Sequence, residues 1–163
     1  MLNPAAFANS PGPTLRSLWK KLEGIPGGKK AFSWAVGTMA PYTGTIGATI
    51  VELRPGYSRV ELQDRRKVRN HLRSVHAVAL VNLAELSTGA AMISALPDGL
   101  RGILVGLSIE YLKKARGTLT AECTVEVGDE MERREIPVHG IIKNAQGEEV
   151  AKATARWLVG PSK

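Results

Sequence analysis

The chain has 163 residues, of which 44% are hydrophobic and 23% charged, and it contains one cysteine. This length and balance fit one folded domain and argue against intrinsic disorder, and a single cysteine excludes a framework of intrachain disulfides. The simplest expectation is a reducing, cytoplasmic location. The net charge of +7 suits an anionic partner, either nucleic acid or a phosphorylated small molecule.

The start of the chain shows no signal-peptide pattern. Residues 1–13 are expected to form a flexible leader, followed by one domain over residues 14–163. Thr14 is placed to cap a short amphipathic helix over Leu15–Leu22, which glycines and a proline then end. The segment from Lys29 to Met39 fits either a strand or a second short helix.

A β-hairpin is predicted next. Its strands cover Ile46–Leu53 and Tyr57–Gln63, and the Arg54-Pro55-Gly56 sequence between them is typical of a tight turn. The polar, basic segment Asp64–Val75 has no clear period, so we expect a loop there.

A long helix is predicted from Ala77 to Leu96, because apolar residues cover almost its whole circumference. Such a helix is normally surrounded by protein. Asn82 and Glu85 interrupt the apolar run, which makes it a poor candidate for a membrane span.

The last third of the chain alternates apolar and polar residues, which is typical of strands with one buried face. The predicted strands cover Ile103–Leu112, Leu119–Val127, Glu132–Lys143 and Ala151–Trp157. Short turns between them imply antiparallel pairing. The sequence therefore predicts an α+β domain in which an antiparallel sheet surrounds one long central helix.

The segment from Asn70 to Glu85 carries the clearest chemical signal. A polar loop leads directly into the N-terminus of the buried helix, where unpaired backbone N–H groups can hold an anion or polarise a carbonyl oxygen. Glu85 lies further along among apolar neighbours, so its carboxyl group must be paired, protonated or functional. A structural pair with an arginine is the alternative to a functional role.

The same segment resembles the hotdog-fold acyl-CoA thioesterases of the phenylacetate-degradation type. The resemblance rests on Asn70, on His76 followed by the small residues Ala77 and Val78, and on Glu85 nine positions after the histidine. The Leu-Ser-Thr-Gly sequence that follows also matches the helix of that family. The resemblance implies a hotdog fold and hydrolysis of acyl-CoA.

The resemblance also implies roles for individual residues. The Ala77 amide would polarise the thioester carbonyl, and Glu85, reaching across a dimer interface, would act as general base or nucleophile. Asn70 would orient water or substrate, and His76 would shape the loop. Coenzyme A would dock on the segment that contains Tyr111, Lys113, Lys114 and Arg116, with further contributions from Arg65, Arg66 and Lys67.

Two positions depart from the family pattern. Ala77 stands where relatives usually have glycine, and Leu104 stands where many relatives have a serine or threonine. These departures keep open a second function, an acyl-CoA-binding module without turnover. Nucleic-acid binding rests on the net charge alone and is the weakest alternative.

The expected partners are therefore an acyl-CoA substrate and a second copy of the chain, as a homodimer or a dimer of dimers. No cofactor and no metal are expected, because His71 and His139 have no partner at metal-ligand spacing.

Overall fold

Three helices, a hairpin, a long helix and four further strands follow one another in the computed structural model, which describes residue 7 and residues 9–162. The elements are α2 (Pro11–Leu22), α3 (Gly28–Met39), α4 (Pro41–Gly44), β1 (Thr49–Arg54), β2 (Tyr57–Leu62), the 3₁₀ helix η1 (Arg66–Val68), α5 (Ala77–Ala95), β3 (Leu100–Tyr111), β4 (Leu119–Thr124), β5 (Arg134–Lys143) and β6 (Glu149–Pro161).

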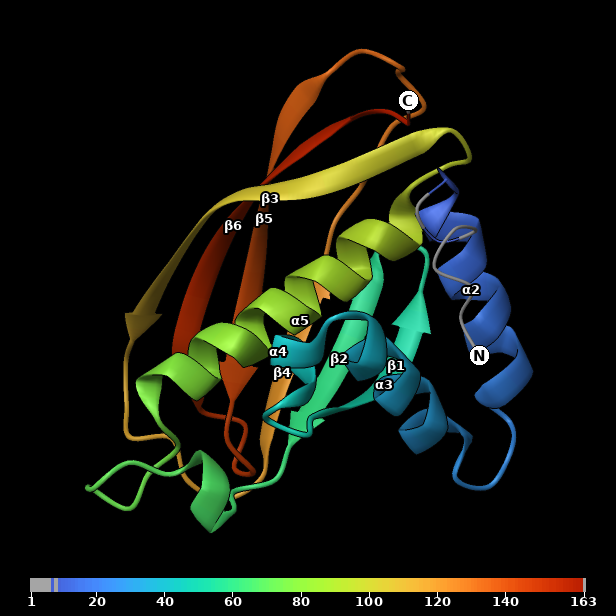
Figure 1. The fold of residues 1–163 in the computed structure, drawn as a ribbon. Helices are drawn as coiled ribbons and strands as arrows, with labels where there is room; N and C mark the ends of the chain where they lie inside the picture. Colours follow the sequence, from blue (N-terminus) through green and yellow to red (C-terminus); the bar gives the residue numbers. More distant parts are fainter. Residues whose placement is uncertain (1–6, 8, 163) are drawn as a thin grey trace.

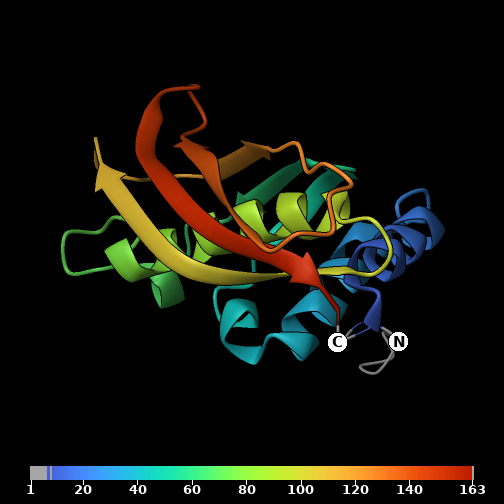
Figure 2. The same cartoon turned by 90° about the horizontal axis from the view of Figure 1, so that it is seen from above.

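The six strands form one antiparallel sheet in the order β1-β2-β4-β5-β6-β3. The sheet curls around α5, while α2, α3 and α4 lie on the opposite side of that helix (Figures 1 and 2). The predicted fold class, a sheet wrapped around one central helix, is confirmed. The predicted strand positions are also correct, although β3 and β6 are longer than expected.

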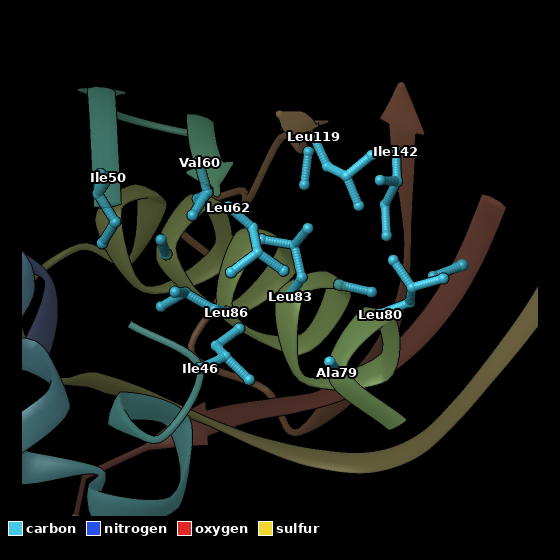
Figure 3. Close-up of a cluster of buried hydrophobic side chains, with 14 of the residues drawn as sticks. Ile46, Ile50, Val60, Leu62, Ala79, Leu80, Leu83, Leu86, Leu119 and Ile142 are labelled. Carbon is cyan, nitrogen blue, oxygen red and sulfur yellow. The ribbon is translucent and has the colours of Figure 1, made fainter. Parts of the chain in front are cut away.

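The main core lies between α5 and the concave face of the sheet. Leu80, Leu83 and Leu86 of α5 belong to one cluster with apolar side chains of β1, β2, β4 and β5 (Figure 3). Those side chains include Ile50, Val60, Leu62, Leu119 and Ile142, all at most 1% exposed. Burying each such side chain stabilises the fold by roughly 1.5–3 kcal/mol, so this packing fixes where α5 lies.

Helix α5 is long and apolar enough to cross a membrane by length and composition, but 67% of its most apolar window is buried inside the molecule. Core helices of globular proteins pass the same test, so the pattern is weak evidence for a span. The burial agrees with the expectation of a helix surrounded by protein.

Helix α2 begins earlier than predicted. Thr14 is not its cap, because the helix starts at Pro11, a residue whose fixed φ suits the first helical position. Pro11 and Gly12 are buried, and any side chain at Gly12 would overlap the Leu96 carbonyl oxygen. The last residues of the expected leader thus pack against the end of α5. Residues 1–6 and 8 of that leader lie outside the described residues.

The ambiguous segment after α2 is the helix α3. Phe32 is fully buried and meets Trp19 edge to face, with ring centroids 5.0 Å apart, whereas Trp34 is 68% exposed. On a strand, Phe32 and Trp34 would lie on the same face. On a helix, side chains that are two residues apart point in nearly opposite directions. The short helix α4 follows and leads back over α5 (Figure 1).

Candidate active site

The N-terminus of α5 has an accessible backbone amide. His76 is the N-cap residue, and its Nδ1 accepts a hydrogen bond from the Val78 N–H at 3.1 Å. Ala77 is exposed, and no acceptor for its N–H exists among the residues that the structure describes. The first turn of a helix carries a partial positive charge, so this amide can receive an anion or a carbonyl oxygen.

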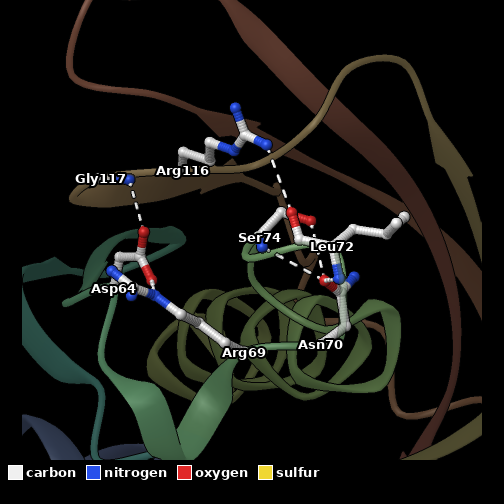
Figure 4. A network of polar contacts seen from close by, with 7 residues as sticks. All are labelled: Asp64, Arg69, Asn70, Leu72, Ser74, Arg116 and Gly117. Carbon is white, nitrogen blue, oxygen red and sulfur yellow. Dashed lines mark hydrogen bonds and ion pairs between the residues drawn. The ribbon is translucent and has the colours of Figure 1, made fainter.

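Asn70 organises the loop that leads into this helix. Its Oδ1 accepts hydrogen bonds from the Leu72 N–H at 2.9 Å and from the N–H and hydroxyl of Ser74 at 3.2 Å each (Figure 4). Arg73, within the same turn, adopts a φ of 54°. The side-chain oxygen of Asn70 is thus occupied in shaping the loop.

A second set of contacts fixes the loop to the strand side of the molecule. Asp64 accepts from Arg69 at 2.6 Å and from the Gly117 N–H at 3.0 Å (Figure 4). The hydrogen bond from the Arg69 guanidinium lowers the pKa of Asp64. The polar segment before α5 is therefore an ordered loop that contains the η1 turn.

Two residues predicted to bind coenzyme A lie beside the start of α5. The Tyr111 hydroxyl donates to the Ala77 carbonyl oxygen at 3.2 Å, and Arg116 donates to the Leu72 carbonyl oxygen at 3.3 Å. Both side chains are exposed. The structure thus places Tyr111 at the first residue of α5 and Arg116 at the loop that precedes this helix.

The two lysines of this segment differ in their contacts. Lys113 forms an exposed ion pair with Glu148 at 2.7 Å, whereas Lys114 is exposed and forms no ion pair within the described part of the chain. An exposed pair contributes little to stability, so both ammonium groups can turn to a phosphate.

Glu85 is a half-buried carboxyl group without a cationic partner. The Thr43 hydroxyl donates to its Oε2 at 3.4 Å, and no basic side chain lies within ion-pair distance in residue 7 or residues 9–162. Burial raises the pKa of Glu85, and the hydrogen bond from Thr43 opposes that shift. The alternative of a structural arginine pair is therefore not found. A raised pKa suits a general base.

Ala77 and Glu85 lie on the same face of α5 but far apart. Ala77, Val78, Val81 and Glu85 fall within about 100° of one another around the helix axis, and Val78 is 51% exposed. Eight residues of helix separate Ala77 from Glu85, which places them about 12 Å apart along the axis. One chain alone cannot bring both groups to a single carbonyl.

A cavity of about 390 Å³ opens beside Glu85, between α5 and the N-terminal helices. Its lining is mostly apolar and includes Val36, Gly89 and Ile93, with Thr43 and Trp157. Sequence reasoning missed Thr43 and Trp157. Both come from segments far from α5 in sequence, and their residue types carried no signal.

Cys123 is buried, and burial raises the pKa of its thiol to about 12, so it is a poor nucleophile. No group of three His, Cys, Asp or Glu side chains that could hold a metal ion occurs within the described residues.

Comparisons with known proteins place this geometry in a family. A family model described as "Domain of unknown function (DUF4442)" matches residues 28–159. No curated protein matches the sequence. Among solved structures, the structural-genomics protein APC5556 is 32% identical, with a TM-score of 0.78 over 90% of this chain and 98% of that one.

Two further solved structures carry thioesterase names. A protein of unknown function from Pseudomonas aeruginosa, named a probable thioesterase, is 21% identical, with a TM-score of 0.72 over 84% of this chain and 97% of that one. A hypothetical thioesterase from Streptococcus pneumoniae, solved with coenzyme A, is 27% identical, with a TM-score of 0.60 over 71% of this chain and 88% of that one. The chain therefore belongs to the DUF4442 family and has the hotdog fold of the thioesterases that it resembles.

Proposed function

We propose that the protein hydrolyses acyl-CoA thioesters. The observation that carries the proposal is the combination of an open helix N-terminal amide at Ala77 with an unpaired, half-buried carboxyl group at Glu85. The similarity to a pneumococcal hypothetical thioesterase solved with coenzyme A supports the choice of substrate.

In the proposed reaction, Glu85 takes a proton from a water molecule as the water oxygen adds to the thioester carbonyl carbon. The Ala77 N–H stabilises the negative oxygen that forms. The carbon–sulfur bond then breaks, the carbonyl re-forms, and Glu85 returns its proton to the departing sulfur. The products are a carboxylic acid and coenzyme A with a free thiol.

Each site needs two copies of the chain, because about 12 Å separate Ala77 from Glu85 along one helix. In a two-fold symmetric dimer with antiparallel α5 helices, Ala77 of one copy approaches Glu85 of the other. The midpoint between these residues is Val81, so the two-fold axis would pass near that half-buried side chain.

The sheet offers a surface for the same dimer. Strand β3 lies at one edge, paired with β6 in the described sheet, and its Ile103 and Val105 are 56% and 41% exposed. A long edge strand with exposed apolar side chains favours pairing with another strand. Pairing of two β3 edges would extend the sheet across a homodimer, which can associate further into a dimer of dimers. A stable monomer in sedimentation analysis would contradict the shared site.

Coenzyme A is proposed to bind along the exposed segment that contains Tyr111, Lys113, Lys114 and Arg116, which meets α5 at Tyr111. Guanidinium and ammonium groups are strong phosphate donors, and Tyr111 already contacts Ala77. The bound thioester would thereby reach the amide.

The test is a panel of acyl-CoA substrates assayed with the parent protein and with Glu85→Gln. We expect the substitution to reduce kcat by at least on the order of 100-fold, because a positioned general base contributes that much. Equal rates for the two proteins would refute the proposed mechanism.

A second function, acyl-CoA binding without turnover, is favoured by one observation. Leu104, at the position where many relatives have a hydroxyl, is a half-buried apolar side chain. Saturable acyl-CoA binding without hydrolysis of any panel member would establish this function instead.

A further inference from the structure

The cavity beside Glu85 follows α5 for two turns. Glu85, Gly89 and Ile93 line it at spacings of four residues, so they form one row along the helix. This row is about 12 Å long. The cavity therefore starts at the carboxyl group and runs away from Ala77. It follows α5 towards the C-terminal end of the helix, beside which α2 lies in Figure 1.

Besides α5, its walls come from the N-terminal helices and from strands β1 and β6. The N-terminal helices contribute Leu15, Val36 and Met39, and strand β6 contributes Trp157. Within the described part of the chain, Glu85 is the one ionisable side chain in this lining. A mostly apolar hollow of this kind suits an apolar group, since an apolar ligand surface is removed from water without loss of hydrogen bonds.

Gly89 keeps the cavity open next to the carboxyl group. An ideal Cβ at this position would lie 3.3 Å from Trp157 Cζ2 and 3.7 Å from Glu85 Oε1. Any side chain here would fill the space between the indole and the carboxyl group. The indole of Trp157 and the carboxyl group of Glu85 thus face each other across the space that Gly89 leaves free.

Glu85 lies where two faces of α5 meet. On one side is the open row of Ala77, Val78 and Val81, and on the other is the cavity row of Gly89 and Ile93. A thioester carbonyl held near Glu85 by the partner's helix would thus have its acyl group directed into the cavity.

We propose that this cavity binds the acyl group and limits the protein to short and medium acyl chains, up to on the order of ten carbons. This inference rests on the proposed thioesterase function. A volume of about 390 Å³ holds on the order of ten groups the size of a water molecule. A chain that advances roughly 1.2 Å per bond, like an extended backbone, covers the row of about 12 Å in about ten bonds.

A larger neighbouring hollow, of about 630 Å³, does not suit the alkyl chain. It shares Val36 and Thr43 with the cavity, but Lys30 and Arg65 also line it. Burying an alkyl chain beside these cations would require their desolvation, which costs free energy. The apolar cavity is therefore assigned to the acyl chain.

The test changes the far end of the cavity. Ile93→Phe should shorten it and Ile93→Ala should lengthen it, and both leave Glu85 in place. Relative to butyryl-CoA, we expect kcat/KM for decanoyl-CoA to fall at least on the order of tenfold in Ile93→Phe, because one misplaced methylene in an apolar pocket has an effect of about that size. In Ile93→Ala the preference should move towards longer chains.

Ile141→Phe is the matched control, because Ile141 is half-buried on β5 and lines neither the acyl cavity nor the larger hollow beside it. A chain-length profile that is the same in all these variants and in the parent would overturn the acyl-pocket proposal while leaving hydrolysis intact. If the parent hydrolyses no acyl-CoA, the proposed function fails, and calorimetry with the uncharged octanamide and decanamide still tests the pocket. Binding of decanamide by the parent that weakens in Ile93→Phe supports the pocket, whereas equal affinity in the two proteins, or no binding by the parent, overturns it.

Discussion

The Thr43 hydroxyl donates a hydrogen bond to Glu85 Oε2 at 3.4 Å, and this contact joins the short helix α4 to the central helix α5. Burial raises the pKa of Glu85, while the hydrogen bond favours its charged form. The N-terminal helices thus influence the ionisation of the group that we propose as general base.

Thr43→Val should move the pH dependence of hydrolysis. Without the hydroxyl donor the pKa of Glu85 rises further, and the base is active as the carboxylate. The rise of kcat/KM with pH should therefore occur at higher pH in the variant than in the parent. Thr38→Val is the control, because that hydroxyl bonds to Trp34 within α3. The same pH profile in Thr43→Val and the parent would show that Thr43 does not act on Glu85.

Glu85→Gln should increase stability at neutral pH while it removes activity. Because burial raises the pKa of Glu85, the folded state binds more protons than the unfolded state between the unfolded and folded pKa values. Stability of the parent therefore falls as pH rises through that window. Thermal unfolding should give a higher Tm for the variant than for the parent at pH 7. This difference in Tm should disappear when the pH is below the range in which a glutamate side chain ordinarily titrates. A lower Tm for the variant at pH 7 would indicate that the charged form is stabilised.

Periodicity was enough to predict the central helix and the hairpins. The run from Ala77 to Leu96 is apolar on nearly every face, and strands such as Leu119–Thr124 alternate strictly. These patterns reflect burial, which the structure shows directly. The chemical positions Ala77 and Glu85 followed from the same helix together with a family resemblance.

The N-terminal helices were harder to predict, for physical reasons. In the segment around Phe32 and Trp34, the alternation of aromatic residues fits a strand, but packing of Phe32 on Trp19 favours a helix. The cap at Thr14 was wrong because Pro11 can start a helix without a side-chain cap. Nothing local in the sequence indicates that Thr43 reaches Glu85, because that contact depends on tertiary packing.

Lys114→Ala and Arg116→Ala should weaken binding of coenzyme A without removing the chemistry. Each should raise KM for an acyl-CoA roughly fivefold, which corresponds to about 1 kcal/mol for a phosphate contact near the surface. The effect should shrink as salt is added, because exposed charges are screened. Lys20→Ala is the control, since Lys20 is an exposed cation on α2.

The same variants can be assayed with an acyl thioester of a short thiol that carries no phosphate. With that substrate, Lys114→Ala and Arg116→Ala should match the parent. An equal loss with both substrates would mean that these side chains act on the loop through contacts such as Arg116 with Leu72, and not on phosphates.

Ala77→Pro should remove the proposed carbonyl-binding donor and leave the helix in place. Proline is favoured at the first helical position, and His76 has the extended conformation, φ −65° and ψ 141°, that the residue before a proline prefers. Loss of one such donor typically reduces kcat by roughly 100- to 1000-fold. Circular dichroism and Tm close to the parent values would show that the loss is chemical.

Mixing Ala77→Pro with Glu85→Gln tests whether two copies share each site. In a hybrid dimer one site has both defects, and the other combines an intact Ala77 amide with an intact Glu85. If subunits of an equal mixture exchange at random, half of the dimers are hybrids, and each hybrid has one working site out of two. Roughly a quarter of the activity of the same amount of parent protein should therefore return. If both groups served the same carbonyl within one chain, mixing would restore nothing, and the 12 Å separation along α5 would have to be bridged by a change in the helix itself.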